Sequence, residues 1–191
     1  KTTVTILPKV ELKVDDALRG KARRQAAGLA LQDIMTDTAV MTAPIDMTLF
    51  EALDLAYRTR DTGRPAIEDP LGTKLSYKKL ITGAQVLGAK IAPLAPQGAA
   101  VGVLLPNSAG VAVTFFALQA TGRVAAMLNF TAGPKNVTAA CTAANIKVVL
   151  TSRVFVEKGH LESLVEAISQ QAKIVYLEDV RATITFADKV K

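Results

Sequence analysis

The second half of the chain alternates short aliphatic runs with helical patterns, and this feature constrains the fold more than any other. The expected strands are 101–105, 124–128, 148–150 and 174–177, and the expected helices are 110–120, 136–143 and 161–168. Elements that alternate at this spacing form right-handed crossovers, which make the strands parallel and cover both faces of their sheet. Aromatic residues make up only 5% of the chain, so its core must be mainly aliphatic. The sequence therefore predicts an α/β fold with a mostly parallel sheet and helices on both faces.

Cap and turn signals mark the region just before this alternation. Thr48 and Glu51 have the spacing of a capping box, which predicts a helix that begins after Thr48. An Asp-Pro-Leu-Gly turn at 69–72 predicts a small hairpin. Ser76 is then expected to cap a helix that ends near residue 92. We expect these elements to open the same domain as the parallel sheet.

A different pattern precedes residue 46. Residues 3–7 alternate β-branched side chains and are stopped by a proline, which predicts a strand. An Ala-rich pattern over 21–41 predicts a helix, and 43–45 form the expected linker. We therefore divide the chain into domains 1–45 and 46–191. Because a strand begins at the first residues and no glycine or proline closes the last element, we expect both ends to be cut from a longer protein.

The charge and cysteine content argue against two classes of protein. The net charge is +6, but the basic residues are spread along the chain, and the one tight group contains no aromatic residue. That group is Arg19, Lys21, Arg23 and Arg24. A nucleic-acid partner is therefore not expected. The single cysteine cannot form an internal disulfide, and no secretory signal is present, so a cytoplasmic location is expected.

The run 91–122 carries no charged residue and is long enough to suggest a membrane span. Prolines at 93, 96 and 106 interrupt it, and its middle is a short β-type run. A buried strand, a turn and a buried helix are therefore expected in place of one membrane helix.

A catalytic site in a parallel sheet lies beyond the carboxyl ends of the strands. The residues expected there are 106–108, 129–133 and 151–153. They include neither a dinucleotide-binding glycine fingerprint nor a P-loop. Residues 131–135 place a hydroxyl, a glycine and a lysine at a helix start, but a single glycine leaves few free amides for a phosphate. We expect an ordinary helix-opening loop there.

Other side chains that could take part in catalysis or bind a metal lack suitable partners in the sequence. His160 is the single histidine, with neither the companions of a triad nor those of a metal site, so it is expected at a helix start. Cys141 lies among alanines and is expected in the core. Five carboxylates are expected at solvated helix and turn positions: Glu51, Asp54, Asp61, Glu68 and Asp69. The sequence thus predicts no catalytic residue, no cofactor-binding residue and no metal ligand.

Three motifs resemble the adenylate-forming (AMP-binding) superfamily, which includes acyl-CoA synthetases, acyl-ACP synthetases and luciferases. They are Leu-Ser-Tyr-Lys-Lys-Leu at 75–80, Val-Gly-Val-Leu-Leu-Pro-Asn-Ser at 101–108 and Ala-Leu-Gln-Ala-Thr-Gly at 117–122. Lys79 stands where that superfamily usually has Glu. The resemblance implies the N-terminal part of the adenylate-forming synthetase fold.

Further segments resemble a family of bifunctional bacterial enzymes, the 2-acylglycerophosphoethanolamine acyltransferase/acyl-[acyl-carrier-protein] synthetases. They are 127–133, 146–153, 155–159, 175–179 and 188–190 on the synthetase side, with 5–8 and 21–24 on the acyltransferase side. The resemblance implies that 1–45 is the tail of the acyltransferase domain with a linker helix, and that 46–191 is the N-terminal part of the AMP-binding domain.

For the intact protein, the resemblance implies activation of a fatty acid with ATP and Mg²⁺, its transfer to acyl carrier protein, and acylation of a lysophospholipid at the cytoplasmic face of the inner membrane. The family's catalytic motifs would lie upstream and downstream of this chain, which is then a non-catalytic scaffold that binds no cofactor. The basic group at 19–24 would face acidic lipid headgroups or simply water. The alternatives are a complete small α/β binding module and part of an acyl-CoA synthetase, whereas the missing glycine fingerprint disfavours a nicotinamide oxidoreductase.

Overall fold

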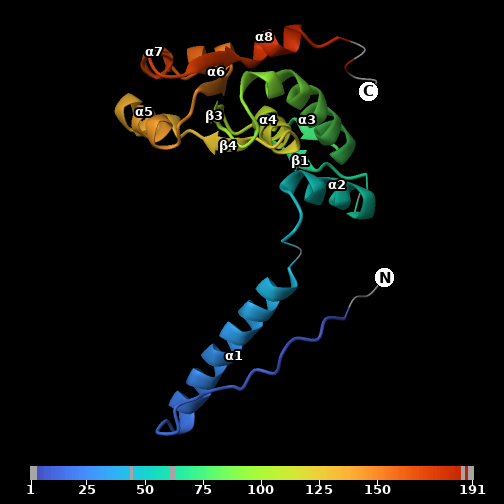
Figure 1. The fold of residues 1–191 in the computed structure, drawn as a ribbon, viewed down its shortest axis with the longest axis vertical. Helices are drawn as coiled ribbons and strands as arrows, with labels where there is room; N and C mark the ends of the chain where they lie inside the picture. Colours follow the sequence, from blue (N-terminus) through green and yellow to red (C-terminus); the bar gives the residue numbers. More distant parts are fainter. Residues whose placement is uncertain (1–3, 44, 61–62, 186–187, 189–191) are drawn as a thin grey trace. The chain divides into compact units, whose positions relative to one another are not determined.

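The computed structural model describes residues 4–43, 45–60, 63–185 and 188. They belong to two compact units, whose boundary falls between Met47 and Thr48. The first unit consists of an extended segment and one long helix, and the second contains the strands and all other helices of the described residues (Figure 1).

The first unit contains one correction to the sequence prediction. Residues 4–7 form no strand, and residue 3, also assigned to that strand, lies outside the described residues. A strand is stabilised by hydrogen bonds to a neighbouring strand, and the described part of the chain supplies none to this segment. The expected helix is confirmed as α1 (Gly20–Thr42), none of whose residues is buried.

Local signals at the start of the second unit are confirmed. Its first elements are α2 (Leu49–Arg60), the antiparallel pair β1 (Ile67–Glu68) and β2 (Lys74–Leu75), and α3 (Tyr77–Ile91). The Thr48 N–H donates to Glu51 Oε2 at 2.7 Å, and the Glu51 N–H donates to Thr48 Oγ1 at 3.2 Å, so the capping box is complete. Ser76 Oγ accepts the Lys79 N–H and caps α3.

Four parallel strands form the main sheet, in the order β4-β3-β5-β6 (Figure 1). They are β3 (Ala100–Leu104), β4 (Val124–Met127), β5 (Val148–Thr151) and β6 (Lys173–Tyr176), each within one residue of its expected bounds. The inner strand β3 pairs on both sides, so that Gly102 lies opposite Ala126 of β4 and Val149 of β5. The parallel sheet predicted from the alternation is confirmed.

Helices cover both faces of this sheet. They are α3, α4 (Ala109–Ala120), α5 (Pro134–Ala143), α6 (Arg153–Lys158), α7 (Glu162–Ser169) and α8 (Leu177–Ala182). Val103 and Leu150 pack in one core with α3, α4 and α8, whereas Leu104 and Val149 pack in the other with α5, α6 and α7. Successive strand residues point to opposite faces, which is why each strand feeds both cores.

The uncharged run 91–122 is divided as expected. Its residues are shared among the end of α3, a 3₁₀ turn η1 (Ala92–Leu94), β3 and α4. Across the described ranges, no helix combines the length and the apolar character that crossing a bilayer requires.

Two glycines allow backbone elements to approach closely. A Cβ added to Gly88 of α3 would lie 3.0 Å from the carbonyl oxygen of Ala117 in α4. A Cβ added to Gly102 of β3 would lie 2.8 Å from Cγ2 of Val149. Both contacts are shorter than ordinary van der Waals contact, so these positions need glycine for packing.

Candidate functional site

The carboxyl edge of the parallel sheet is the place where an α/β fold binds its ligands. Four segments lie at this edge, one after each strand. They contain residues 105–108 after β3, 128–133 after β4, 152 after β5 and 177–179 at the start of α8 after β6. Thr151 ends β5 here, and its buried hydroxyl donates to the Leu104 carbonyl at 2.8 Å, which ties the ends of β5 and β3 together.

A polar cluster joins the segments that follow β5 and β6. Ser152 Oγ and the Arg153 N–H both donate to Glu178 Oε1, at 2.8 and 2.9 Å. The Arg153 guanidinium donates to both carboxylate oxygens of Asp179, at 2.8 and 2.7 Å, and its Cζ lies 4.3 Å from the centre of the Tyr176 ring. These contacts fix the start of α6 against the start of α8.

The electrostatics of this cluster favour ionised carboxylates. Burial raises the pKa of Glu178, but hydrogen bonds from the Ser152 hydroxyl and from backbone N–H groups, that of Arg153 among them, together outweigh burial and hold its pKa below the ordinary value. The hydrogen bonds from Arg153 lower the pKa of Asp179, and the same pair raises the pKa of Arg153. Neither carboxyl group is therefore suited to donate a proton at neutral pH.

Sequence reasoning identified only part of this cluster. Ser152 and Arg153 were among the residues expected at the edge, but Glu178 and Asp179 were not. Both acidic residues directly follow the fourth expected strand, 174–177, but only the ends of the first three strands were considered. The same rule applied to the fourth strand places Glu178 and Asp179 at the carboxyl edge.

The loop after β4 is braced by its own side chains. Asn129 Oδ1 accepts the Thr131 N–H at 3.1 Å and its hydroxyl at 2.8 Å, and this turn forms η2 (Phe130–Ala132). Gly133 has φ +80°, and Pro134, which has no N–H, begins α5. The side chain of Lys135 is exposed. The Thr131 N–H is already engaged and Pro134 has none, so these two positions cannot donate to a phosphate.

The Asp69 carboxylate binds the backbone at the start of α4. Its Oδ1 accepts the N–H groups of Leu71 and Thr73, at 3.0 and 2.8 Å, and its Oδ2 accepts the Ala109 N–H at 3.0 Å. The Ala109 and Thr73 amides hold the pKa of Asp69 below its ordinary value. The expectation of a solvated carboxylate is wrong here, because Asp69 is 8% exposed and 40 residues separate it from Ala109.

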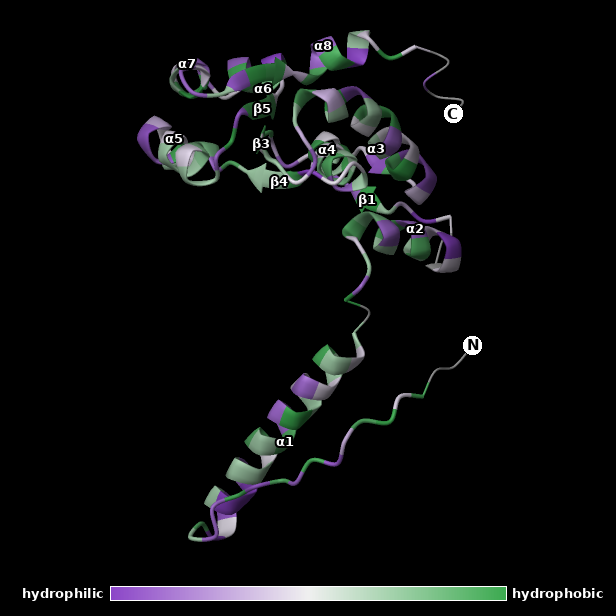
Figure 2. Ribbon diagram, in the orientation of Figure 1, coloured by the Kyte–Doolittle hydropathy of each residue, from purple (hydrophilic) through white to green (hydrophobic). Residues whose placement is uncertain are grey.

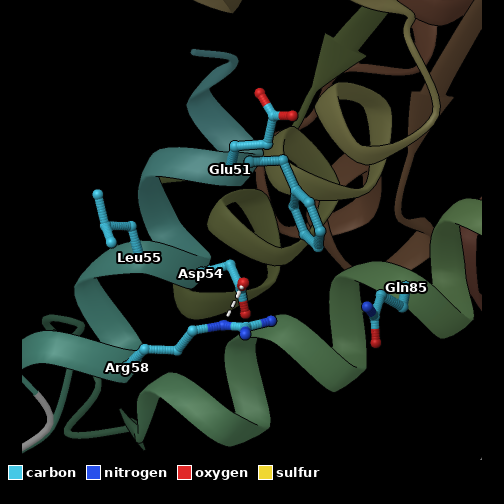
Figure 3. A pocket seen from close by; sticks show the side chains of 6 residues that line it. Glu51, Asp54, Leu55, Arg58 and Gln85 are labelled. Atoms are coloured by element: carbon cyan, nitrogen blue, oxygen red, sulfur yellow. Dashed lines mark hydrogen bonds and ion pairs between the residues drawn. The ribbon is translucent and has the colours of Figure 1, made fainter. Parts of the chain in front are cut away.

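A surface hollow of about 390 Å³ lies between α2 and α3 (Figure 3). Its lining residues are Phe50, Glu51, Asp54, Leu55, Arg58 and Gln85. Glu51 and Asp54 are thus brought to one hollow, but Glu51 is held by the capping box and Asp54 pairs with Arg58 at 2.7 Å. Both carboxylates are engaged in helix contacts, so they do not form an acid/base pair.

The remaining candidates that the structure describes make their contacts away from this edge. Glu68 pairs with Lys74 across the small hairpin at 3.0 Å, and Asp61 lies outside the described residues. His160 is exposed, with φ +49°, and its N–H donates to the Glu157 carbonyl in the turn before α7. Cys141 is buried in the core, as expected, and burial raises the pKa of its thiol.

Within the described ranges, no three His, Cys, Asp or Glu side chains gather in a way that could hold a metal ion. Glu178 Oε2 is the one buried side-chain nitrogen or oxygen there that lacks a hydrogen-bond partner. The edge therefore carries the polar cluster, in which Glu178 Oε2 is an acceptor without a partner among the described residues. It can support or orient a ligand, and the described residues supply no nucleophile activated by a base.

Comparisons with known proteins agree with this geometry. A family model described as AMP-binding enzyme matches residues 56–190. The N-terminal subdomain of Klebsiella oxytoca NpsA, in complex with 3-hydroxybenzoyl-AMSN, is 15% identical, with a TM-score of 0.59 over 73% of this chain and 32% of that chain. The N-terminal domain of FACL13 from Mycobacterium tuberculosis is 17% identical, with a TM-score of 0.61 over 73% of this chain and 37% of that chain.

A putative long-chain-fatty-acid CoA ligase from Rhodopseudomonas palustris is 14% identical, with a TM-score of 0.59 over 72% of this chain and 37% of that chain. This chain spans about a third of the length of these three structures. At such low identity, the structural likeness shows a shared fold.

Proposed function

The chain belongs to the AMP-binding enzyme family, and from this membership we propose that it forms part of an enzyme that activates a carboxylic acid with ATP. The observation that carries the proposal is the family match over residues 56–190, the region that contains the whole parallel sheet. The likeness to N-terminal subdomains of adenylate-forming structures supports the same assignment.

We propose a fatty acid as the activated acid and the thiol of acyl carrier protein as its acceptor. The intact protein would then also acylate a lysophospholipid at the cytoplasmic face of the inner membrane. Support comes from the segments that resemble the bifunctional acyltransferase/acyl-ACP synthetases, above all 127–133 and 146–153. On this proposal, residues 1–45 are the tail of the acyltransferase domain and residues 46–191 open the synthetase domain.

Enzymes of this family use ATP and Mg²⁺, but the described residues do not fit a complete site for either. The start of α4 already receives the Asp69 carboxylate, and the described residues contain no metal-binding cluster. Asp179 is paired with Arg153, so it is not a free ligand for a cation. We therefore assign no catalytic step to this chain and propose that it is a scaffold for a site completed elsewhere in the protein.

Adenylate formation by the intact polypeptide tests the proposal. We expect the full-length protein, purified from its own cells, to release pyrophosphate from ATP when a fatty acid is added, and hydroxylamine to trap the acyl adenylate as a hydroxamate. The 191-residue chain should show no turnover under the same conditions. Pyrophosphate release without any dependence on an added acid would contradict an acid-activating enzyme.

Two further readouts separate the finer alternatives. Acyl transfer to acyl carrier protein but not to coenzyme A would support the proposed acceptor, and the reverse would point to an acyl-CoA synthetase. The mass of the native polypeptide, detected with an antibody against this segment, should be several times 20.2 kDa. A native mass equal to 20.2 kDa would favour the small binding module.

A further inference from the structure

The first unit exposes large apolar side chains on both of its elements. Hydrophobic and hydrophilic residues alternate along the ribbon of this unit (Figure 2). No residue of α1 is buried. The exposed apolar residues are Leu29, Leu31, Met35, Val40 and Met41 on α1, and Val4, Ile6, Val10 and Leu12 on the extended segment. A helix and an extended segment that bury so little have no core of their own, so this surface is open to a partner.

Residues 9–15 carry a strand pattern without a strand partner. Val10, Leu12 and Val14 alternate with charged residues at 9, 11, 13 and 15. Val10 lines one hollow against α1, and Leu12 and Val14 line another. The apolar side chains thus lie beside the helix but are not covered by it, because Val10 remains 62% exposed and Leu12 47% exposed. In the described part of the chain, the backbone of residues 4–14 makes no hydrogen bond.

The free backbone decides which kind of partner fits. A lipid surface or an apolar groove would cover the side chains but leave the amides and carbonyls of an extended segment unpaired, which is costly away from water. Another strand satisfies both requirements, since it pairs the backbone and extends the apolar face.

The charges of residues 9–15 are complementary to those of a second copy that runs in the opposite direction. We propose that residues 9–15 pair with the same residues of a second copy as an antiparallel two-stranded ribbon, with both α1 helices on its apolar face. The pairs are Leu12 with Leu12, Val10 with Val14, Glu11 with Lys13, and Lys9 with Asp15. Each charged residue then faces the opposite charge, which stabilises a strand pair.

Neighbouring registers lack this match. A shift of two residues in one direction sets Glu11 against Glu11, and a shift in the other direction sets Lys13 against Lys13. Parallel pairing in register opposes like charges at every charged position. Two strands alone are marginally stable, so the ribbon needs the helices packed on it, which the apolar residues of α1 allow.

Charge reversal with rescue tests the pairing in the 191-residue chain. Sedimentation equilibrium should find a reversible dimer of twice 20.2 kDa. Glu11→Lys places two lysines opposite each other at two symmetric positions, so we expect its dissociation constant to rise by about tenfold or more. Lys13→Glu should weaken the dimer similarly, and the double variant Glu11→Lys/Lys13→Glu should restore it. Glu157→Lys, an equal charge change at an exposed residue of α6, should leave it unchanged.

A cross-link tests the register. In the proposed ribbon, residue 12 faces itself across the twofold axis, so Leu12→Cys should form an intermolecular disulfide on mild oxidation. Val10→Cys faces residue 14 of the other copy and should cross-link far less. The native Cys141 is buried, so it should not contribute.

Three results would overturn the proposal. The first is a chain that stays monomeric at every concentration. The second is a dimer that Glu11→Lys does not weaken, because its interface would lie elsewhere. The third is protection of the amides of residues 9–15 from hydrogen exchange that appears only with anionic phospholipid vesicles, because the segment would then bind lipid.

Discussion

Asp69 offers the sharpest test at the scale of single residues. Asp69→Ala removes the acceptor of three backbone N–H groups, from Leu71, Thr73 and Ala109. We expect the melting temperature of the second unit to fall by several degrees, because buried donors are left unpaired. Thermal unfolding followed by circular dichroism measures the change. Glu68→Ala is the matched control, since it removes only an exposed ion pair and should be nearly neutral.

The pH dependence of the same contact has a definite sign. The folded-state pKa of Asp69 is lowered, so its contribution is present above the unfolded pKa, near 3.8, and is lost as the pH falls through the folded value. The difference in melting temperature between the native chain and Asp69→Asn should therefore shrink as the pH drops below 3.8. A difference that stays constant through this range would show that the charge of Asp69 is unimportant.

Single carboxylates also show where sequence reasoning succeeds and where it fails. The role of Glu51 could be predicted, because its partner Thr48 lies three residues away and the capping box is a local pattern. The role of Asp69 could not, because one of its donors lies 40 residues along the chain. The pairing of Arg153 with Asp179 in the polar cluster could not be predicted for the same reason, as 26 residues separate them.

At the scale of elements, the contact between α3 and α4 depends on Gly88. Gly88→Ala would place a Cβ 3.0 Å from the Ala117 carbonyl oxygen, and a backbone atom cannot easily move away. Gly83→Ala, in the same helix, meets only side-chain atoms of Val113, the nearest at 3.3 Å. Both variants gain the same helix propensity, so their difference isolates the packing cost.

We expect Gly88→Ala to be less stable than Gly83→Ala by about 1–3 kcal/mol, as measured by urea unfolding. Equal stabilities would mean that α3 and α4 can separate without cost.

Elements were predicted where their patterns are long or strictly alternating. The strands of the sheet lie within one residue of their expected bounds because each is a compact aliphatic run flanked by turns. The helices α6 and α8 were missed because six residues are too few to show a helical period. The strand expected at residues 3–7 is not formed over the described residues 4–7, because alternation gives a propensity, whereas a strand also needs a neighbour.

At the scale of the whole molecule, the second unit should fold without the first. Among the described residues, the three hydrophobic clusters are built from residues after Met47. A chain that begins at Thr48 should therefore melt within about 2 °C of the 191-residue chain, since a surface change has little effect on the core. Differential scanning calorimetry of both chains makes the comparison. A fall of many degrees would mean that residues 1–47 stabilise the sheet directly.

The position of β3 inside the sheet also sets an order of events during synthesis. Leu104 of β3 lies opposite Thr151 of β5, and 47 residues separate them. At a translation rate of about 5–20 residues per second, β5 is synthesised roughly 2–10 s after β3, and the edge of β3 that pairs with β5 is unpaired until then. During this interval a nascent chain displays an apolar strand with a free backbone edge. The ribosome-bound chain is therefore most exposed to aggregation, and most attractive to chaperones, between the synthesis of β3 and that of β5.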